Sequence, residues 1–276
     1  STMQSSDAYS GRLVYYGDVT GDDMQAVSST KRVANYYRFN FTKDDNPSSH
    51  WSYLYSIIQN CNLILMNIDK LVIDEDDKAY RDDLKGEALA IRGLALFDLT
   101  RIFGYPYLKD DGASLGVPII EGLSTIDSKP TRNTVAQCYT KIIDDLTQSL
   151  SLLGEKFNKG KINKWGAMVL LSRVYLYKGE NANALKMASD AIIGAEKNKY
   201  ALWTNEDYPT AWGEDASASK PGEVLFEIVN LTTDSPGKES MGYLNSYDGY
   251  DDMCITCSFY QFLKEDPKDI RLKLLS

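Results

Sequence analysis

Residues 168–191 read MVLLSRVYLYKGENANALKMASDA, and this stretch decides the fold. Leu171 and Tyr175 lie four positions apart before Gly179, and Ala184 and Ala191 lie seven positions apart after it. Apolar or small residues at these steps mark one face of an α-helix, and a glycine between two such segments indicates a tight turn. The stretch therefore predicts two helices that fold back on each other.

The same residues match one unit of the tetratricopeptide pattern. Ser172 takes its small-residue position, and its Leu, Tyr, inter-helix Gly and two Ala positions are taken by Leu171, Tyr175, Gly179, Ala184 and Ala191. Met168 and Ala188 stand where the pattern has Trp and a late aromatic residue. Units of this kind bury their apolar face against neighbouring helices. Leu171 and Tyr175 are accordingly predicted to be packing residues and not ligands.

Outward from this pair, the helical period predicts three earlier helices. They start near Trp51, Lys78 and Thr134, and the last two end near Phe103 and Leu153. The first helix is predicted to be buried on a broad front as far as Val72, with Ile57, Ile64 and Leu71 widening its apolar stripe. The second carries Gly86, Ala90 and Gly93 on its apolar side, which predicts the close approach of a neighbouring helix.

Beyond Tyr200 the composition shifts to Gly, Pro, Ser, Asp and Tyr, with one strand-like apolar run at residues 224–229. We therefore expect a mainly α protein of tetratricopeptide-like helix pairs, with a loop-rich segment and minor β structure. The expected domains are a helical core at 1–200 and a loop-rich segment at 201–276.

Composition excludes several classes of function. The chain has 276 residues, with 30 basic and 39 acidic side chains and a net charge of −9. This balance argues against nucleic acid and against an anionic membrane surface, both of which need a basic face. No apolar run approaches the roughly 18 residues of a spanning helix, and the first residues do not resemble a signal peptide. Because the chain does not open with Met, we expect a processed or trimmed product.

The chain offers few residues for catalysis or metal binding. His50 is its only histidine, and its four cysteines are Cys61, Cys138, Cys254 and Cys257. The common phosphate-loop, dinucleotide, zinc-protease and serine-hydrolase motifs are absent, so we expect no cofactor and no catalytic or metal site. The acidic run at 74–77 is interpreted as a solvated first helical turn, since it lacks the spacing of a calcium loop.

The cysteines are interpreted as structural. Cys61 falls on an apolar helix stripe and is expected to be a core thiol. Cys254 and Cys257 form a lone Cys-x-x-Cys, just downstream of three aspartates that would raise a thiol pKa. The pair is therefore taken as two partly buried small residues, with a local disulfide as an alternative.

The most informative feature of the composition is its number of aromatic residues, above all tyrosines. The chain has 19 Tyr against 8 Phe, and several aromatic residues of the late segment lie among Asn and Asp. An aromatic face packs against the C–H side of a sugar ring, while neighbouring Asn and Asp accept hydrogen bonds from its hydroxyls. The competing interpretation is that these tyrosines only cover the flank of the helical scaffold. From this chemistry the candidate ligand-binding residues are Tyr243, Tyr247, Asp248, Tyr250 and Trp212, with Asn46 and His50 as a second wall before the first long helix.

Several blocks resemble the SusD/RagB family, in the family's order. These blocks are Gly17-Asp18 with Gly21-Asp22-Asp23, the Trp51–Asn62 helix, Gly86–Leu99, Arg101–Tyr107, Arg132–Leu146, Asn163–Tyr177, Glu223–Ile228, and Phe262 with Asp266-Pro267. Lys268 stands where the family usually has Arg. The resemblance covers nearly the whole chain.

The resemblance implies a non-catalytic, lipid-anchored protein on the outer face of the outer membrane. Such a protein captures a glycan or other nutrient and hands it to a SusC-like TonB-dependent transporter, over which it sits as a lid. Family members are roughly twice this long, so the C-terminal half and the lipid-bearing N-terminal Cys are expected to be missing. Two alternatives stay open: a helical-repeat scaffold that binds a protein, and a glycosidase, because 39 acidic residues always offer carboxylate pairs.

Overall fold

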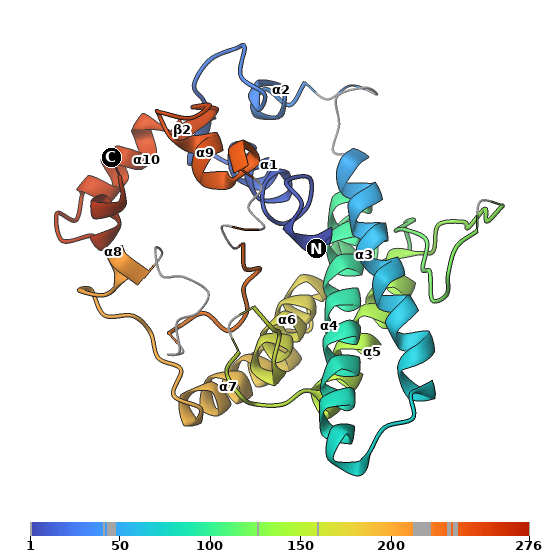
Figure 1. Ribbon diagram of the computed structural model, residues 1–276. Helices are drawn as coiled ribbons and strands as arrows, with labels where there is room; N and C mark the ends of the chain where they lie inside the picture. Colours follow the sequence, from blue (N-terminus) through green and yellow to red (C-terminus); the bar gives the residue numbers. More distant parts are fainter. Residues whose placement is uncertain are drawn as a thin grey trace. The chain divides into compact units, whose positions relative to one another are not determined.

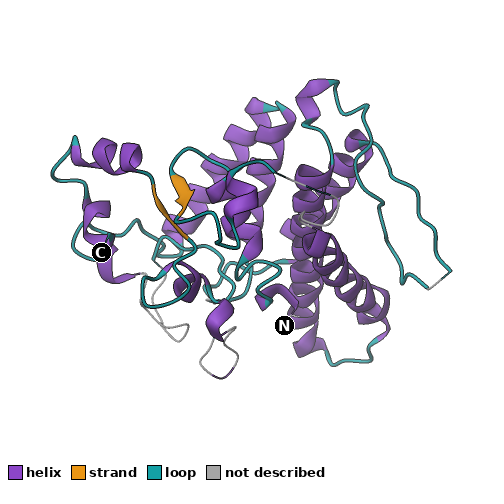
Figure 2. Cartoon of the chain, turned by 90° about the horizontal axis from the view of Figure 1, so that it is seen from above, coloured by secondary structure: helices purple, strands orange, loops and turns teal. Residues whose placement is uncertain are grey.

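The chain is mainly helical, as expected. The structure, a computed structural model, describes residues 2–40, 42, 48–125, 127–158, 160–211, 222–230, 233 and 237–275. Figure 2 shows helices and loops, with one small two-stranded sheet in the part of the chain that is described. No helix in that part is long and apolar enough to cross a membrane.

The described residues form α-helices, short strands and short 3₁₀ turns (Figure 1). The α-helices are α1 Arg12–Val19, α2 Ala34–Tyr37, α3 Ser48–Asn67, α4 Lys78–Phe103, α5 Val135–Leu152, α6 Lys164–Lys178, α7 Asn181–Lys197, α8 Tyr208–Ala211, α9 Met241–Asn245 and α10 Cys257–Lys264. The strands are β1 Met24–Ala26 and β2 Met253–Ile255. Short 3₁₀ turns are η1 Thr2–Gln4, η2 Ile68–Lys70, η3 Glu75–Asp77, η4 Tyr107–Lys109, η6 Gly237–Glu239 and η7 Ile270–Leu274.

The chain forms two compact units. The first unit comprises Ser1–Tyr53, Leu202–Ala218 and Ile228–Ser276, and the second comprises Leu54–Ala201 and Ser219–Glu227. In this division residues 1–53 group with residues 202–218 and 228–276, and not with the long helices. Pairing of β1 with β2 is one contact that joins these two distant stretches.

Helices α4 and α5 of the second unit pack closely because α4 presents glycines to α5. A Cβ at Gly86 would lie 2.9 Å from Leu153 Cγ, and one at Gly93 would lie 3.1 Å from Leu146 Cγ. Contacts this short leave no room for a larger residue. The predicted close approach along this face of α4 is confirmed.

Helices α6 and α7 form the predicted hairpin. Asn163 caps α6 by accepting a hydrogen bond from Gly166 N, and Gly179 ends the helix in the left-handed region at φ +84°. A glycine adopts that conformation without the cost that other residues meet. In the second helix of the pair, Gly194 lies directly against the indole of Trp165, a buried residue of α6.

The broad burial predicted for the first long helix is confirmed at Ile57, which is 3% exposed, but is wrong at Ile64 and Leu71. α3 ends at Asn67, and its buried apolar side chains, such as Leu54 and Ile58, form a single stripe. Ile64 is 45% exposed, and Val72, which lies beyond the helix, is fully exposed. An apolar residue at helical spacing is buried only where another element covers its face, and that cover is not encoded in the period.

The strand predicted at residues 224–229 is also absent. This run is half-buried and has no partner in a β-ladder among the described residues. It packs on the start of α6, where a Cβ at Gly166 would lie 3.4 Å from Leu225 O and Phe226 Cβ. Burial against a helix satisfies the apolar side chains of the run without strand pairing.

The sheet of the first unit supports the late segment. β1 and β2 pair antiparallel, with Met24 opposite Ile255 and Ala26 opposite Met253. Beneath them the fully buried side chains of Val19, Val33, Leu244 and Met253 form one apolar cluster. This cluster fixes α9 and β2, and with them the turn between them, to the N-terminal segment.

Candidate functional site

Four of the predicted site residues, Tyr243, Tyr247, Asp248 and Tyr250, lie in α9 or in the turn that joins it to β2. Ser240 caps the N-terminus of α9, and its Oγ accepts a hydrogen bond from Tyr243 N at 3.3 Å. After α9 the chain folds back, and Tyr250 N donates to Tyr243 O at 2.9 Å. The two rings meet edge to face, with centroids 5.1 Å apart and planes at 83°. We call residues 243–252 the tyrosine turn.

The turn depends on a glycine. A Cβ at Gly249 would lie 2.0 Å from Tyr243 O, a distance that no side chain tolerates. Two residues later Asp251 takes the left-handed conformation at φ +48°, which Asp tolerates better than most residues. Backbone geometry therefore holds the turn in a tight, specific shape.

Exposure divides the tyrosines of the turn into two kinds. Tyr247 is 89% exposed, and Asp248 beside it is exposed as well. Tyr243 is half-buried and Tyr250 is 38% exposed. Tyr247 thus presents an open aromatic face next to a carboxylate, whereas Tyr243 and Tyr250 form the base of the turn.

Arg32, which the sequence analysis did not single out, contacts this base. Its guanidinium lies over the Tyr250 ring, with Cζ 3.9 Å from the ring centroid. It also donates from Nε to Asp252 at 2.9 Å and pairs with Glu239 at 3.2 Å. Arg32 and Asp252 are 220 residues apart in sequence, so no local pattern connects them.

Of the remaining predicted residues the structure describes His50, which is not part of this cluster. His50 is 1% exposed in the first turn of α3, with Nδ1 3.0 Å from Asp7 O and its ring 6.1 Å from that of Tyr16. Its side chain therefore has almost no surface to offer a ligand. Trp212 and Asn46 lie outside the described residues.

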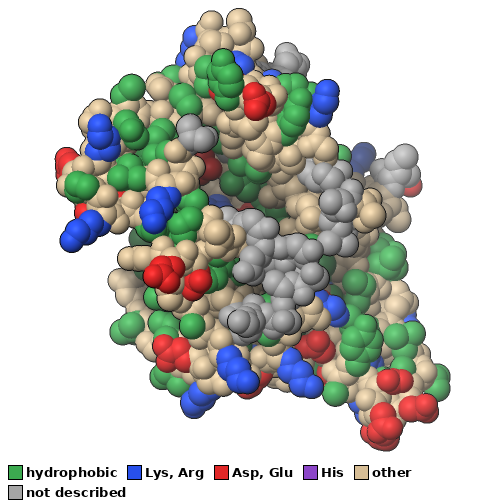
Figure 3. All heavy atoms as spheres, turned by 60° about the vertical axis from the view of Figure 1, so that its left-hand side comes forward, with side chains coloured by type: hydrophobic (Ala, Val, Ile, Leu, Met, Phe, Trp, Pro, Cys, Tyr) green, Lys and Arg blue, Asp and Glu red, His purple; other side chains and the backbone are tan. Residues whose placement is uncertain are grey.

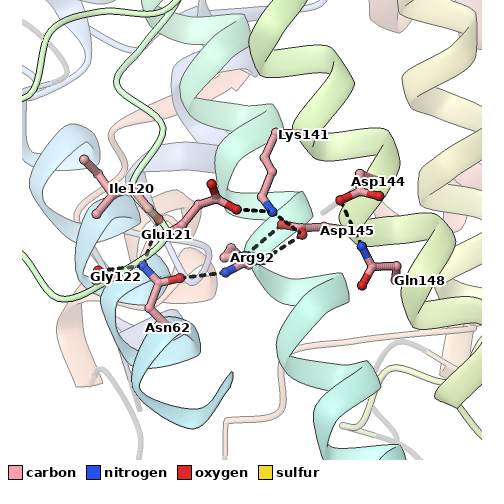
Figure 4. A network of polar contacts seen from close by, with 9 residues as sticks. All are labelled: Asn62, Arg92, Ile120, Glu121, Gly122, Lys141, Asp144, Asp145 and Gln148. Atoms are coloured by element: carbon pink, nitrogen blue, oxygen red, sulfur yellow. Dashed lines mark hydrogen bonds and ion pairs between the residues drawn. The ribbon is translucent and has the colours of Figure 1, made fainter. Parts of the chain in front are cut away.

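A second polar cluster, also missed by the sequence analysis, is buried in the second unit (Figure 4). Arg92 of α4 donates from Nε and Nη2 to both carboxylate oxygens of Asp145 at 2.8 and 2.7 Å, and from Nη1 to Asn62 Oδ1 at 2.8 Å. Lys141 lies 3.2 Å from Asp145 and 2.6 Å from Glu121. Burial alone would lower the pKa of Arg92, but the hydrogen bonds and charge of Asp145 raise it above its ordinary value.

Asn62 of this cluster and two other side chains of α3 hold the segment around residues 118–124 against α3 by hydrogen bonds. Asn62 Nδ2 donates to Ile120 O at 2.8 Å and to Gly122 O at 3.0 Å. Tyr55 OH donates to Pro118 O at 2.7 Å, and Gln59 Nε2 donates to Ser124 Oγ at 2.9 Å. Tyr55, Gln59 and Asn62 lie on one face of α3. Because its polar groups are paired with one another and tie α3, α4, α5 and the 118–124 segment together, we assign the cluster a structural role.

The cysteines are free thiols. Cys254 is in β2 and Thr256 is extended at φ −73° and ψ 153°, so about 3.3 Å per residue places the Cα atoms of Cys254 and Cys257 roughly 10 Å apart. A disulfide needs Cα atoms within about 7 Å, so the local disulfide considered above does not fit. Cys61 is buried, as expected of a core thiol.

Thiol reactivity should follow this burial. Burial raises the pKa of Cys61 to about 12 and also raises that of Cys138. Both thiols stay protonated and covered near pH 8, so iodoacetamide should modify exposed Cys257 and spare these two in the folded protein. Peptide mass spectrometry before and after denaturation would measure this. Equal labelling of Cys61 and Cys257 in the folded state would contradict the packing described for α3.

Neither a cluster of metal ligands among the described side chains nor a single basic patch on the face drawn in Figure 3 is found. Within the described ranges, no group of three or more His, Cys, Asp or Glu side chains could hold a metal ion. On the face drawn in Figure 3, acidic and basic side chains are interspersed with hydrophobic ones and do not gather into one basic patch.

A protein-family model matches the part of the chain that contains most of the long helices. The model of SusD-like proteins, described as starch-binding and associating with the outer membrane, matches residues 4–176, more than half of the chain. A curated SusD-like protein from Bacteroides ovatus is 28% identical over 135 residues, which are 48% of this chain and 23% of that protein.

Solved structures match over nearly all of this chain. A protein from Bacteroides vulgatus described as sugar binding is 82% identical, with a TM-score of 0.96, over 100% of this chain and 62% of its own. A SusD superfamily protein from the same species is 38% identical, with a TM-score of 0.89, over 98% of this chain and 61% of its own. The chain thus spans about three fifths of the length of these two solved relatives.

Proposed function

This chain belongs to the SusD-like family, and on that premise we propose that it binds an oligosaccharide at the tyrosine turn without transforming it. The observation that carries the proposal is the 89% exposed ring of Tyr247, held on a rigid turn beside the carboxylate of Asp248. A flat aromatic face stacks on the C–H face of a sugar, and a carboxylate accepts hydrogen bonds from its hydroxyls.

Tyr243 and Tyr250 support that ring instead of stacking on sugar themselves. One face of Tyr250 is covered by Arg32, and the edge-to-face contact occupies part of Tyr243. A base that is fixed before binding lowers the entropy cost of ordering the site. Trp212 would extend the aromatic surface and stays a prediction.

Replacing Tyr247 with Ala should weaken oligosaccharide binding by about tenfold or more, since an exposed stacking ring contributes on the order of 1.4 kcal/mol or more. Titration calorimetry with maltoheptaose, chosen for the family's starch-binding description, and with laminariheptaose, chosen for a laminarin-binding SusD-like protein of the same fold, would measure the loss.

Tyr80→Ala is the matched control, because Tyr80 is a 59% exposed tyrosine of α4 in the other unit. The Tyr80→Ala variant should bind the oligosaccharides with the same affinity as the wild type. Equal affinity of the Tyr247 and Tyr80 variants would move the site away from the tyrosine turn. The same assay on Trp212→Ala tests the predicted extension of the surface.

Delivery to a SusC-like TonB-dependent transporter at the outer membrane, through a lipid-anchored form of the protein, is the role that family membership supports. Co-expression with a SusC-like TonB-dependent barrel, followed by co-purification, tests the partnership. Incubation with the oligosaccharides should release no reducing sugar. A protein-binding scaffold is favoured instead if a broad glycan panel gives no binding, and the exposed apolar residues Leu185 and Ile192 of α7 would then be its first candidates.

A further inference from the structure

We propose that Arg32 is the positioning residue of the sugar site: it contacts no sugar and acts through Tyr250 and Asp252 to hold the tyrosine turn in its binding shape. This inference rests on the proposed function for its effect on affinity, and on the geometry alone for its effect on the turn.

The guanidinium of Arg32 uses its face and its edge at the same time. Its face covers the Tyr250 ring at 3.9 Å from the centroid. Along its edge, Nε and Nη2 lie 2.9 and 2.8 Å from Asp252 Oδ2, while Nη1 donates to Glu239 at 3.2 and 3.3 Å. Only a planar group with several fixed donors makes all of these contacts together, and a lysine ammonium does not.

Asp252 binds Arg32 through its carboxylate and the rest of the protein through its backbone. It is 4% exposed, so its carboxylate depends on the charge of Arg32 for compensation. Its N–H donates to Leu244 O at 2.9 Å, and its carbonyl accepts from Val27 N at 3.2 Å. The Arg32–Asp252 pair thus ties the end of the turn to α9 on one side and to the N-terminal segment on the other.

Tyr250 is held from three directions. Its N–H binds Tyr243 O, its ring lies under Arg32, and its carbonyl accepts a hydrogen bond from Lys31 Nζ at 2.6 Å. Two of these three contacts come from residues 31 and 32. Without them Tyr250 would keep its edge-to-face contact and its hydrogen bond with Tyr243 but lose its ties to the N-terminal segment, and Tyr247 at the tip would sample more orientations before it meets a sugar.

The experiment compares Arg32→Lys and Arg32→Met with Arg38→Lys and Arg38→Met in protein labelled with 3-fluorotyrosine. Arg38 is an exposed arginine of the same segment, just after α2. Tyr250→Phe assigns the Tyr250 fluorine resonance. Affinity is measured with maltoheptaose and laminariheptaose, and thermal melts check that each variant is folded.

We expect both Arg32 variants to shift or broaden the Tyr250 resonance and to bind sugar about tenfold more weakly, the loss of roughly one good interaction. Both Arg38 variants should match the wild type in both measurements. Arg32→Lys keeps the charge next to Asp252, so it stays informative if Arg32→Met does not fold.

An unmoved Tyr250 resonance in a folded Arg32 variant would overturn the proposal. A moved resonance with unchanged sugar affinity would also overturn it, because the turn would then not be the site that Arg32 positions. If the wild type binds neither sugar, the proposed function fails, and the resonance alone decides whether Arg32 holds the turn.

Discussion

Replacing Asp145 with Ala should lower the free energy of unfolding by about 3–5 kcal/mol, the cost of leaving a buried ion without its partner. Asp145 is fully buried, and both of its carboxylate oxygens bind the Arg92 guanidinium (Figure 4). In the variant, Arg92 stays buried at 7% exposure and keeps its hydrogen bond to Asn62 but loses both bonds to a carboxylate, while Lys141 loses one of its two carboxylate partners. Urea denaturation followed by circular dichroism would measure the loss.

Asp144→Ala is the matched control for this variant. Asp144 is the neighbouring residue of α5, but it is exposed and accepts a hydrogen bond only from Gln148, at 2.9 Å. Its removal should change stability by no more than about 0.5 kcal/mol. A second variant that replaces Arg92 with Met and Asp145 with Leu should recover most of the loss, because it removes both buried charges together. Equal losses for Asp144→Ala and Asp145→Ala would contradict the described network.

Replacing Trp165 with Ala should cost about 3–5 kcal/mol, the usual range for deleting a buried indole. Trp165 is 6% exposed and joins Met168 of α6 to Ala191 and Ala195 of α7 and to Tyr200 in one apolar cluster. The indole fills the space that Gly194 leaves open, so the α6–α7 hairpin loses its largest contact. Thermal and urea denaturation would both report the change.

Gly194→Ala tests the same contact from the other side. Its Cβ would lie 2.1 Å from Trp165 Cζ3, and overpacking of this kind costs about 1–3 kcal/mol. In the double variant with Trp165→Ala the clash is gone, so the two losses should not add. Gly17→Ala in α1 is the control, since nothing lies within 4 Å of its Cβ, and it should be neutral or stabilising. Additive losses for the pair would show that Trp165 does not rest on Gly194.

The long helices of the second unit could be predicted because their signals are local. The expected helix at 78–103 has the bounds observed for α4, and the expected helix pair around Gly179 is observed as α6 and α7. Gly179 ends α6 in the left-handed conformation, and Thr134 caps α5 with a capping box. Apolar period, cap residues and glycines all act within a few residues of where they stand, so one sequence is enough to locate them.

Two expectations failed where burial depends on distant parts of the chain. The apolar run at 224–229 packs on α6 and forms no ladder, and Ile64 is exposed although it fits the α3 stripe. The apolar patterns of residues 224–229 and of α3 predict only that each segment is buried against another part of the protein. Which element covers it, and whether any does, is decided by the assembled fold.

The residues of the tyrosine turn could be selected from the sequence, but their arrangement could not. Tyr243, Tyr247 and Tyr250 could be chosen as neighbouring aromatic residues, yet the contact between the rings of Tyr243 and Tyr250 and the exposure of Tyr247 needed the turn geometry. His50, chosen as a second wall, is 1% exposed, because α3 places it against Asp7 and Tyr16. Arg32 carries no motif and was found only through its contacts.

The amino-acid sequence by itself determined the helices, the tetratricopeptide-like hairpin and the family, because each depends on residues close together along the chain. Only the tertiary structure decided which carboxylates face which arginines. Asp145 meets Arg92 across 53 residues, and Asp252 meets Arg32 across 220. A carboxylate and an arginine interact strongly only when folding brings them together and removes water from between them, and this depends on the packing of the whole chain.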